Sequence, residues 1–149
     1  MQIRDLLTES LMIDELVNNT KDSVLTEMVE KLALTDKLSN KEMFHKAVLE
    51  REAEYSTGIG MGIAIPHGKS SGVKEASLVF ARSKAGVDFD SMDGKPAHLL
   101  FMIAVPEAAN DDHLKILGTL SRKLMHQSIR EALMNATTYE DVIAVFEDA

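Results

Sequence analysis

The chain has 149 residues, of which 45% are hydrophobic and 27% charged, and it contains no cysteine. We therefore expect one globular domain over residues 1–149, without disulfides, thiolate metal sites or a cysteine nucleophile. A net charge of −8 argues against a general nucleic-acid-binding surface, because phosphate backbones require clustered Lys and Arg.

The N-terminal region carries no pattern of a secretion signal or a membrane anchor. It lacks a cationic stretch followed by an apolar run, and the longest apolar block of the chain, Leu99–Val105, has only seven residues. We expect a cytoplasmic protein.

The first elements in chain order are a short strand and two capped helices. Leu11–Ile13 predicts the strand. Thr20 precedes one run of apolar residues with helical spacing, and Asn40 precedes a second from Lys41 to about Glu54; both residue types cap helices. The residues that we expect the second helix to bury are Met43, Phe44, Ala47 and Val48.

A glycine-rich stretch, TGIGMGIAIPHGKS (Thr57–Ser70), follows the second helix. Isoleucine and methionine alternate with glycine and alanine over residues 58–65, which predicts extended chain for at least part of the stretch. Further strands are predicted at Ala76–Ser83 and His98–Val105, separated by an Asp93–Pro96 turn. That turn favours at least one antiparallel pair.

Helices are predicted to close the chain. Asn110, Asp111 and Asp112 offer the start of the first, and two shorter helices follow over about 129–134 and 139–147. The apolar stripe of the first is Leu114, Leu117, Leu120, Leu124 and Met125. With helices before and after the strands, we expect an α/β fold in which a mixed β-sheet is covered by helices on both faces, a three-layer α/β/α architecture.

The glycines do not fit a nucleotide-binding loop. A Walker loop that ends at Gly68–Ser70 needs its first glycine at position 63, which is Ile63. A dinucleotide fingerprint that starts at Gly58 or Gly60 needs its third glycine at Ile63 or Ile65.

A calcium loop also fails on spacing. Asp88, Asp90 and Asp93 resemble the ligand pattern, but the third acid comes one residue late and the bidentate position is Leu99. We interpret this region as a charged hairpin turn.

His67 is the candidate for chemistry in the glycine-rich stretch. Pro66 fixes the approach of the chain, and Gly68 leaves one side of the ring sterically open. Imidazole is largely neutral near pH 7 and nucleophilic, and a hydrogen bond to one ring nitrogen leaves the other lone pair for attack. From its position alone, a strand-end histidine satisfied by a backbone carbonyl is the favoured interpretation.

Three runs together form a specific pattern: Leu49–Glu52 with its Arg-Glu pair, Ser56–Gly60 (STGIG) and Ile63–Gly68 (IAIPHG). They resemble the EIIA domain of the fructose/mannitol class in the bacterial phosphoenolpyruvate-dependent sugar phosphotransferase system. Residues 81–117 and LSRKLM (120–125) resemble the fructose-type branch. The likeness covers nearly the whole chain.

The resemblance implies a phosphohistidine relay. In that family phospho-HPr donates a phosphoryl group to the EIIA histidine, which passes it to an EIIB partner and so indirectly serves a membrane EIIC segment. His67 takes the place of the phosphoacceptor, and Arg51 and His113 take the places of two residues that the family sets around the phosphate. No metal, nucleotide or other cofactor is implied.

Each supporting residue also has a plainer interpretation. Arg51 is flanked by Glu50 and Glu52 and would then be a solvated charge on a helix face. His113 would be an exposed first-turn residue, or a weak metal ligand with its acidic neighbours. Thr57 would either give its hydroxyl to the phosphate or serve only at the start of a strand or turn.

Two rival functions follow. A regulatory phosphocarrier, as in the nitrogen-related branch of the same fold, would share the site but control a target protein by its phosphorylation state. A metal- or nucleotide-dependent enzyme is weakened by the failed spacings. The resemblance of residues 81–117 to the fructose branch favours sugar transport.

Overall fold

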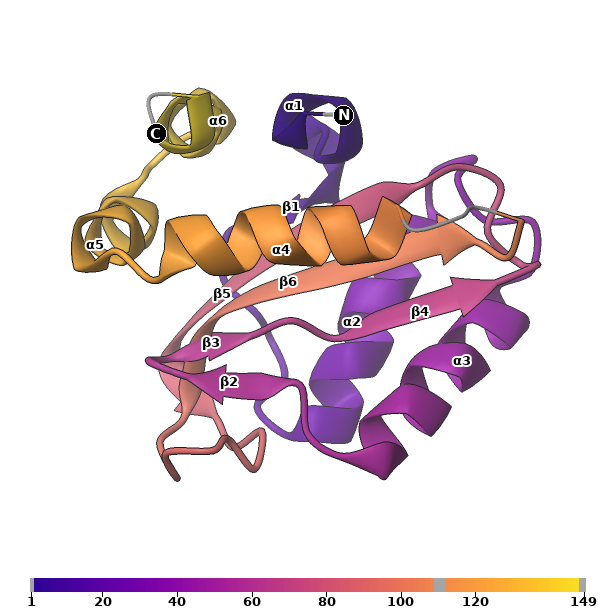
Figure 1. The fold of residues 1–149 in the computed structure, drawn as a ribbon, viewed down its shortest axis with the longest axis horizontal. Helices are drawn as coiled ribbons and strands as arrows, with labels where there is room; N and C mark the ends of the chain where they lie inside the picture. The colour runs from indigo at the N-terminus through magenta and orange to yellow at the C-terminus, as the bar shows by residue number, and fades with distance from the viewer. Residues whose placement is uncertain (1, 109–111, 148–149) are drawn as a thin grey trace.

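A computed structural model describes residues 2–108 and 112–147, the side chains of Asp112 and His113 excepted. A six-stranded mixed sheet lies between layers of helices, which confirms the predicted architecture (Figure 1). The helices are α1 (Ile3–Leu6), a 3-10 turn (Glu9–Leu11), α2 (Lys21–Ala33), α3 (Lys41–Glu54), α4 (Asp112–Leu124), α5 (Gln127–Asn135) and α6 (Tyr139–Glu147). The strands are β1 (Met12–Ile13), β2 (Gly58–Gly60), β3 (Ile63–Ala64), β4 (His67–Ser70), β5 (Ser77–Val87) and β6 (Ala97–Pro106).

Strands β5 and β6 form the centre of the sheet. The order is β1-β5-β6-β3-β2. Strand β4 also pairs with β6, nearer the C-terminal end of β6 than β3 does. The β5 and β6 strands run antiparallel, as predicted, with Phe80 opposite Phe101 and their rings 4.8 Å apart. Both β3 and β4 run parallel to β6. Residues 99–105 are all buried because both faces of β6 are covered, which explains their unbroken apolar run.

Helices α2 and α3 cover one face of the sheet and α4 lies across the other (Figure 1). The predicted caps are confirmed: the Ser23 amide donates to the Thr20 hydroxyl, and the Met43 amide donates to the side-chain oxygen of Asn40 at 3.0 Å. No helix in residues 2–108 and 112–147 is long and apolar enough to cross a membrane.

Gly68 allows α3 to lie close against β4. A Cβ at this position would stand 3.0 Å from Val48 Cγ2 and 3.1 Å from Phe44 Cε1. Phe44 and Val48 therefore make the contact, as predicted. The expectation for Met43 was wrong, since it is 46% exposed.

The glycine-rich stretch is a hairpin, not one continuous strand. Strands β2 and β3 pair antiparallel around a two-residue loop, Met61–Gly62, in which both residues have positive φ, 58° and 77°. Period two cannot distinguish a strand from two strands joined by a tight turn. Asp93 accepts a hydrogen bond from the Met61 amide at 3.0 Å. Backbone donors from Lys95 and Met61 lower the pKa of the Asp93 carboxyl.

Met61 occupies a conformation that suits asparagine or glycine better. A positive φ costs an ordinary L-residue roughly 1–2 kcal/mol, and Asn-Gly is the preferred pair in such turns. We expect Met61→Asn to raise the free energy of unfolding by about 1 kcal/mol, measured by urea denaturation. Met92→Asn is the control, since Met92 is 88% exposed and lacks a positive φ. A Met61→Asn variant no more stable than wild type would contradict the assignment of strain.

Candidate functional site

His67 begins β4 and pairs with Ile103 of β6. Its side chain is half-buried, and its Nδ1 lies 2.9 Å from the carbonyl oxygen of Ile65. A carbonyl oxygen only accepts, so Nδ1 carries the proton and the neutral ring has its lone pair on Nε2. A hydrogen bond to a backbone carbonyl was the alternative to a chemical role for His67. The bond to the Ile65 carbonyl instead selects the Nδ1-protonated tautomer, which is the one that attack through Nε2 requires.

Arg51 lies in the last turn of α3, beside His67. Its guanidinium carbon is 4.2 Å from the centre of the Tyr55 ring, and its Nη1 donates to the Tyr55 carbonyl oxygen at 2.9 Å. Two adjoining hollows of about 530 Å³ each are lined by both Arg51 and His67. The fold therefore brings these two predicted residues, sixteen positions apart, to one surface.

Apolar side chains surround the two hollows. Tyr55 is 69% exposed, Met92 88% and Leu114 55%, while Leu117 lines both hollows. Leu114 was expected in the buried stripe of its helix, and that expectation was wrong; Ile116 is buried instead. Exposed apolar groups beside a candidate reactive group are typical of a protein-docking surface.

Thr57 lies next to the hollow but has another partner. It is buried, its hydroxyl donates to the Glu52 carboxylate, and its amide donates to the same carboxylate at 3.0 Å. The hydroxyl proton is therefore directed to Glu52 and not toward the ring of His67. From the sequence, Glu52 was named only as a neighbour of Arg51, and its burial was missed.

His113 belongs to the first turn of α4, but its side chain, like Asp111 and Asp112, lies outside what the structure describes. A metal site formed by His113 with its acidic neighbours therefore lies outside the described side chains as well. Among the residues whose side chains the structure describes, no group of three His, Cys, Asp or Glu is arranged to hold a metal ion.

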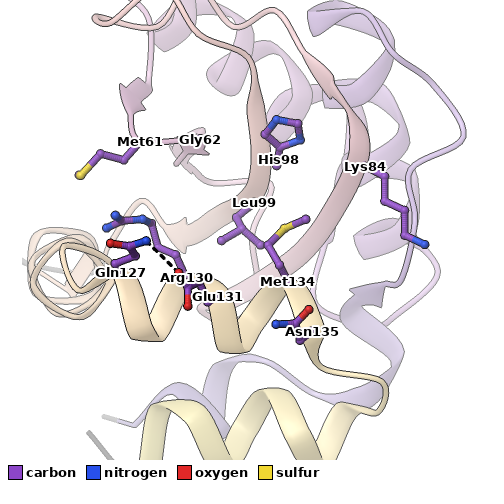
Figure 2. Close-up of a pocket in the computed structure, with 10 residues that line it drawn as sticks. All are labelled: Met61, Gly62, Lys84, His98, Leu99, Gln127, Arg130, Glu131, Met134 and Asn135. Atoms are coloured by element: carbon purple, nitrogen blue, oxygen red, sulfur yellow. Dashed lines mark hydrogen bonds between the residues drawn. The ribbon is translucent and has the colours of Figure 1, made fainter.

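A third hollow, of about 590 Å³, lies apart from these two, between α5, the Met61–Gly62 turn and the start of β6 (Figure 2). It is lined by His98, which stands five residues before the partner of His67 on β6, roughly 16 Å along the strand. Its polar groups bond within the protein. His98 Nδ1 donates to the Ser83 carbonyl oxygen at 2.8 Å, Arg130 donates to the last carbonyls of α4, and the Gln127 amide donates to Glu131.

Comparison with known proteins identifies the family of the chain. The family model "Phosphoenolpyruvate-dependent sugar phosphotransferase system, EIIA 2" matches residues 5–149. The chain is 43% identical over 145 residues to the fructose-specific EIIABC component of Bacillus subtilis, covering 97% of this chain but only 23% of that protein. It is 45% identical over 128 residues to the fructose-specific EIIA component of Haloferax volcanii, covering 84% of this chain and 83% of that one.

A solved structure has the same fold. The crystal structure of nitrogen regulatory protein IIA-Ntr from Neisseria meningitidis superposes with a TM-score of 0.84 at 34% identity, over 95% of this chain and 97% of that one. The family match, the relatives and the shared fold lead to one conclusion. The chain belongs to the EIIA 2 family of the phosphoenolpyruvate-dependent sugar phosphotransferase system and is a phosphotransferase component of that system.

Proposed function

We propose that the protein accepts a phosphoryl group from phospho-HPr on Nε2 of His67 and passes it to an EIIB partner. The hydrogen bond from His67 Nδ1 to the Ile65 carbonyl supports this most directly, because it leaves the lone pair on Nε2. In the first step an N–P bond forms at Nε2 while the bond between phosphorus and the donor breaks. In the second, the N–P bond at His67 breaks as the acceptor attacks phosphorus.

Arg51 is the proposed ligand of the phosphoryl oxygens. A guanidinium supplies two parallel N–H donors, which match the equatorial oxygens of the group in transfer. One N–H of the Arg51 guanidinium donates to the Tyr55 carbonyl, and a guanidinium carries five such donors. His113 is proposed as a second ligand on the family's pattern, while the Thr57 hydroxyl supports Glu52 and serves the phosphate indirectly.

Transport of a fructose-class sugar is the favoured context. The two fructose-specific relatives share 43% and 45% of residues with this chain, more than the 34% of the IIA-Ntr structure. An EIIB partner would then hand the phosphoryl group onward for uptake through a membrane EIIC segment. The regulatory alternative keeps the same His67 chemistry and predicts no transfer to a fructose-class EIIB.

The decisive experiment incubates the protein with phosphoenolpyruvate, enzyme I and HPr. We expect about one phosphoryl group per chain, labile in acid and stable in alkali, as expected for a phosphohistidine. Addition of a fructose-class EIIB should remove the label. A wild-type protein that takes no label would reject the proposal, and a label that EIIB cannot remove would favour the regulatory alternative.

Arg51→Ala should slow the transfer without unfolding the protein. Removing one preorganised donor to a developing charge typically costs roughly 100- to 1,000-fold in rate, and we expect a loss of about 100-fold in single-turnover phosphorylation by phospho-HPr. Arg122→Ala is the control, because Arg122 is an exposed arginine of α4 whose side chain donates to Thr119. An unchanged rate in Arg51→Ala would make Arg51 a solvated charge after all.

A further inference from the structure

Glu52 is a buried acid among exposed ones. Only 5% of its side chain is exposed, whereas Glu50 and Glu54 on the same helix are exposed. It follows Phe44 and Val48 at intervals of four, and so lies on the helix face that packs against the sheet. Burying a carboxylate is costly unless it is paired and hydrogen-bonded.

Donors from Lys21 and Thr57 surround the Glu52 carboxylate beside the candidate site. It accepts hydrogen bonds from the Thr57 amide and hydroxyl, and it pairs with the Lys21 ammonium at 2.7 Å. Lys21 also lies 5.2 Å from the centre of the Phe89 ring and 3.8 Å from Asp90. The carboxylate therefore ties the ends of α2 and α3 to the residue that precedes β2.

A chain of hydrogen bonds continues from Thr57 to the imidazole of His67. The Thr57 carbonyl accepts from the Ile65 amide at 3.0 Å. The Ile65 carbonyl then accepts from His67 Nδ1 at 2.9 Å. The acceptor that selects the tautomer of His67 thus belongs to Ile65, whose amide bonds to Thr57, and Thr57 in turn bonds to Glu52.

The interactions of Glu52 also fix the position of Arg51, because the two residues are neighbours in α3. Arg51 directly precedes Glu52 in the last turn of α3. One buried carboxylate is thereby connected to the proposed nucleophile and to the proposed phosphate ligand.

We propose that Glu52 is a positioning residue for phosphoryl transfer, which holds His67 in the Nδ1-protonated tautomer and Arg51 beside it. The inference rests on the proposed function of His67. Phosphoryl transfer depends on in-line approach to a lone pair that points at phosphorus, so a tilted or wrongly protonated ring reduces the rate even where both partners still bind.

Glu52→Gln tests the proposal, because the amide keeps the size of the side chain but loses its charge and one acceptor. In the unphosphorylated variant, ¹⁵N NMR should find His67 as a mixture of tautomers, where the wild type is mainly protonated on Nδ1. The single-turnover rate with phospho-HPr should fall roughly 10- to 100-fold, while the KM for phospho-HPr stays within about twofold. Glu42→Gln, an exposed acid in the first turn of the same helix, is the matched control and should change none of these.

Thr57→Val provides a second variant if Glu52→Gln does not fold. It removes the hydroxyl bond and keeps the amide bond, so the same changes should occur with a smaller amplitude. Folded variants that keep the wild-type tautomer and transfer rate would overturn the proposal, even if they melt at lower temperature. If the wild type itself takes no label, the proposed function fails, whereas the tautomer measurement still decides whether Glu52 orients the ring.

Discussion

His67→Ala is expected to take no phosphoryl label from phosphoenolpyruvate, enzyme I and HPr, under conditions that label the wild type fully. Among the described side chains, His67 is the one imidazole that lines the two hollows with Arg51, and the substitution removes it as the proposed phosphoacceptor. Loss of label should be complete, at least about 1,000-fold, because the covalent intermediate itself is lost. Mass spectrometry under alkaline conditions and a radiolabel count both measure it.

His98 is an internal control for this prediction. It has the same tautomer as His67, fixed by the same kind of bond from Nδ1 to a backbone carbonyl. It faces a different hollow, however, which is lined by neither Arg51 nor the exposed apolar groups around His67 (Figure 2). His98→Gln should therefore label as the wild type does. Label that persists in His67→Ala and disappears in His98→Gln would identify His98 as the phosphoacceptor, in the hollow between α5 and the start of β6.

Local chemistry made much of the fold predictable. Thr20 and Asn40 cap their helices through contacts within three residues, and the strands β5 and β6 follow from their own apolar runs. The hairpin at Met61–Gly62 was not predictable from period two, because the alternation continues through a turn in which both residues have positive φ.

The candidate site was predictable only where residue chemistry and spacing agree. His67 was identified from its neighbours and the family pattern, but Glu52 was missed because it was considered only as one of the acids that flank Arg51. A signal was present: Phe44, Val48 and Glu52 recur every four residues, which places the acid on the buried face. Leu114 shows the converse, since apolar spacing predicted burial for a residue that lies exposed beside the hollow.

Arg82 is the residue whose loss should destabilise the fold most among the substitutions considered. It extends from β5, and 8% of its side chain is exposed. Its Nη1 donates to the carbonyl oxygens of Leu133 and Ala136 at 2.9 and 2.5 Å, its Nε donates to the Asp14 carbonyl at 3.2 Å, and its Nη2 pairs with the Asp14 carboxylate. One guanidinium thus joins the end of α5 to the residue after β1.

Arg82→Met should lower the free energy of unfolding by about 3 to 5 kcal/mol. Methionine fills much of the space, but it leaves the Leu133 and Ala136 carbonyls without their donor, and each buried unsatisfied group costs roughly 1–3 kcal/mol. For a chain of this length such a loss lowers the melting temperature by about 10 °C or more. Lys84→Met, which replaces an exposed cation two residues along β5, is the control and should change stability by less than about 0.5 kcal/mol.

Because Arg82 bonds to α5 and the segment after β1, not to the surface around His67, the folded fraction of Arg82→Met should still accept phosphate at the wild-type rate. A loss of less than about 1 kcal/mol would mean that water replaces the guanidinium at those carbonyls.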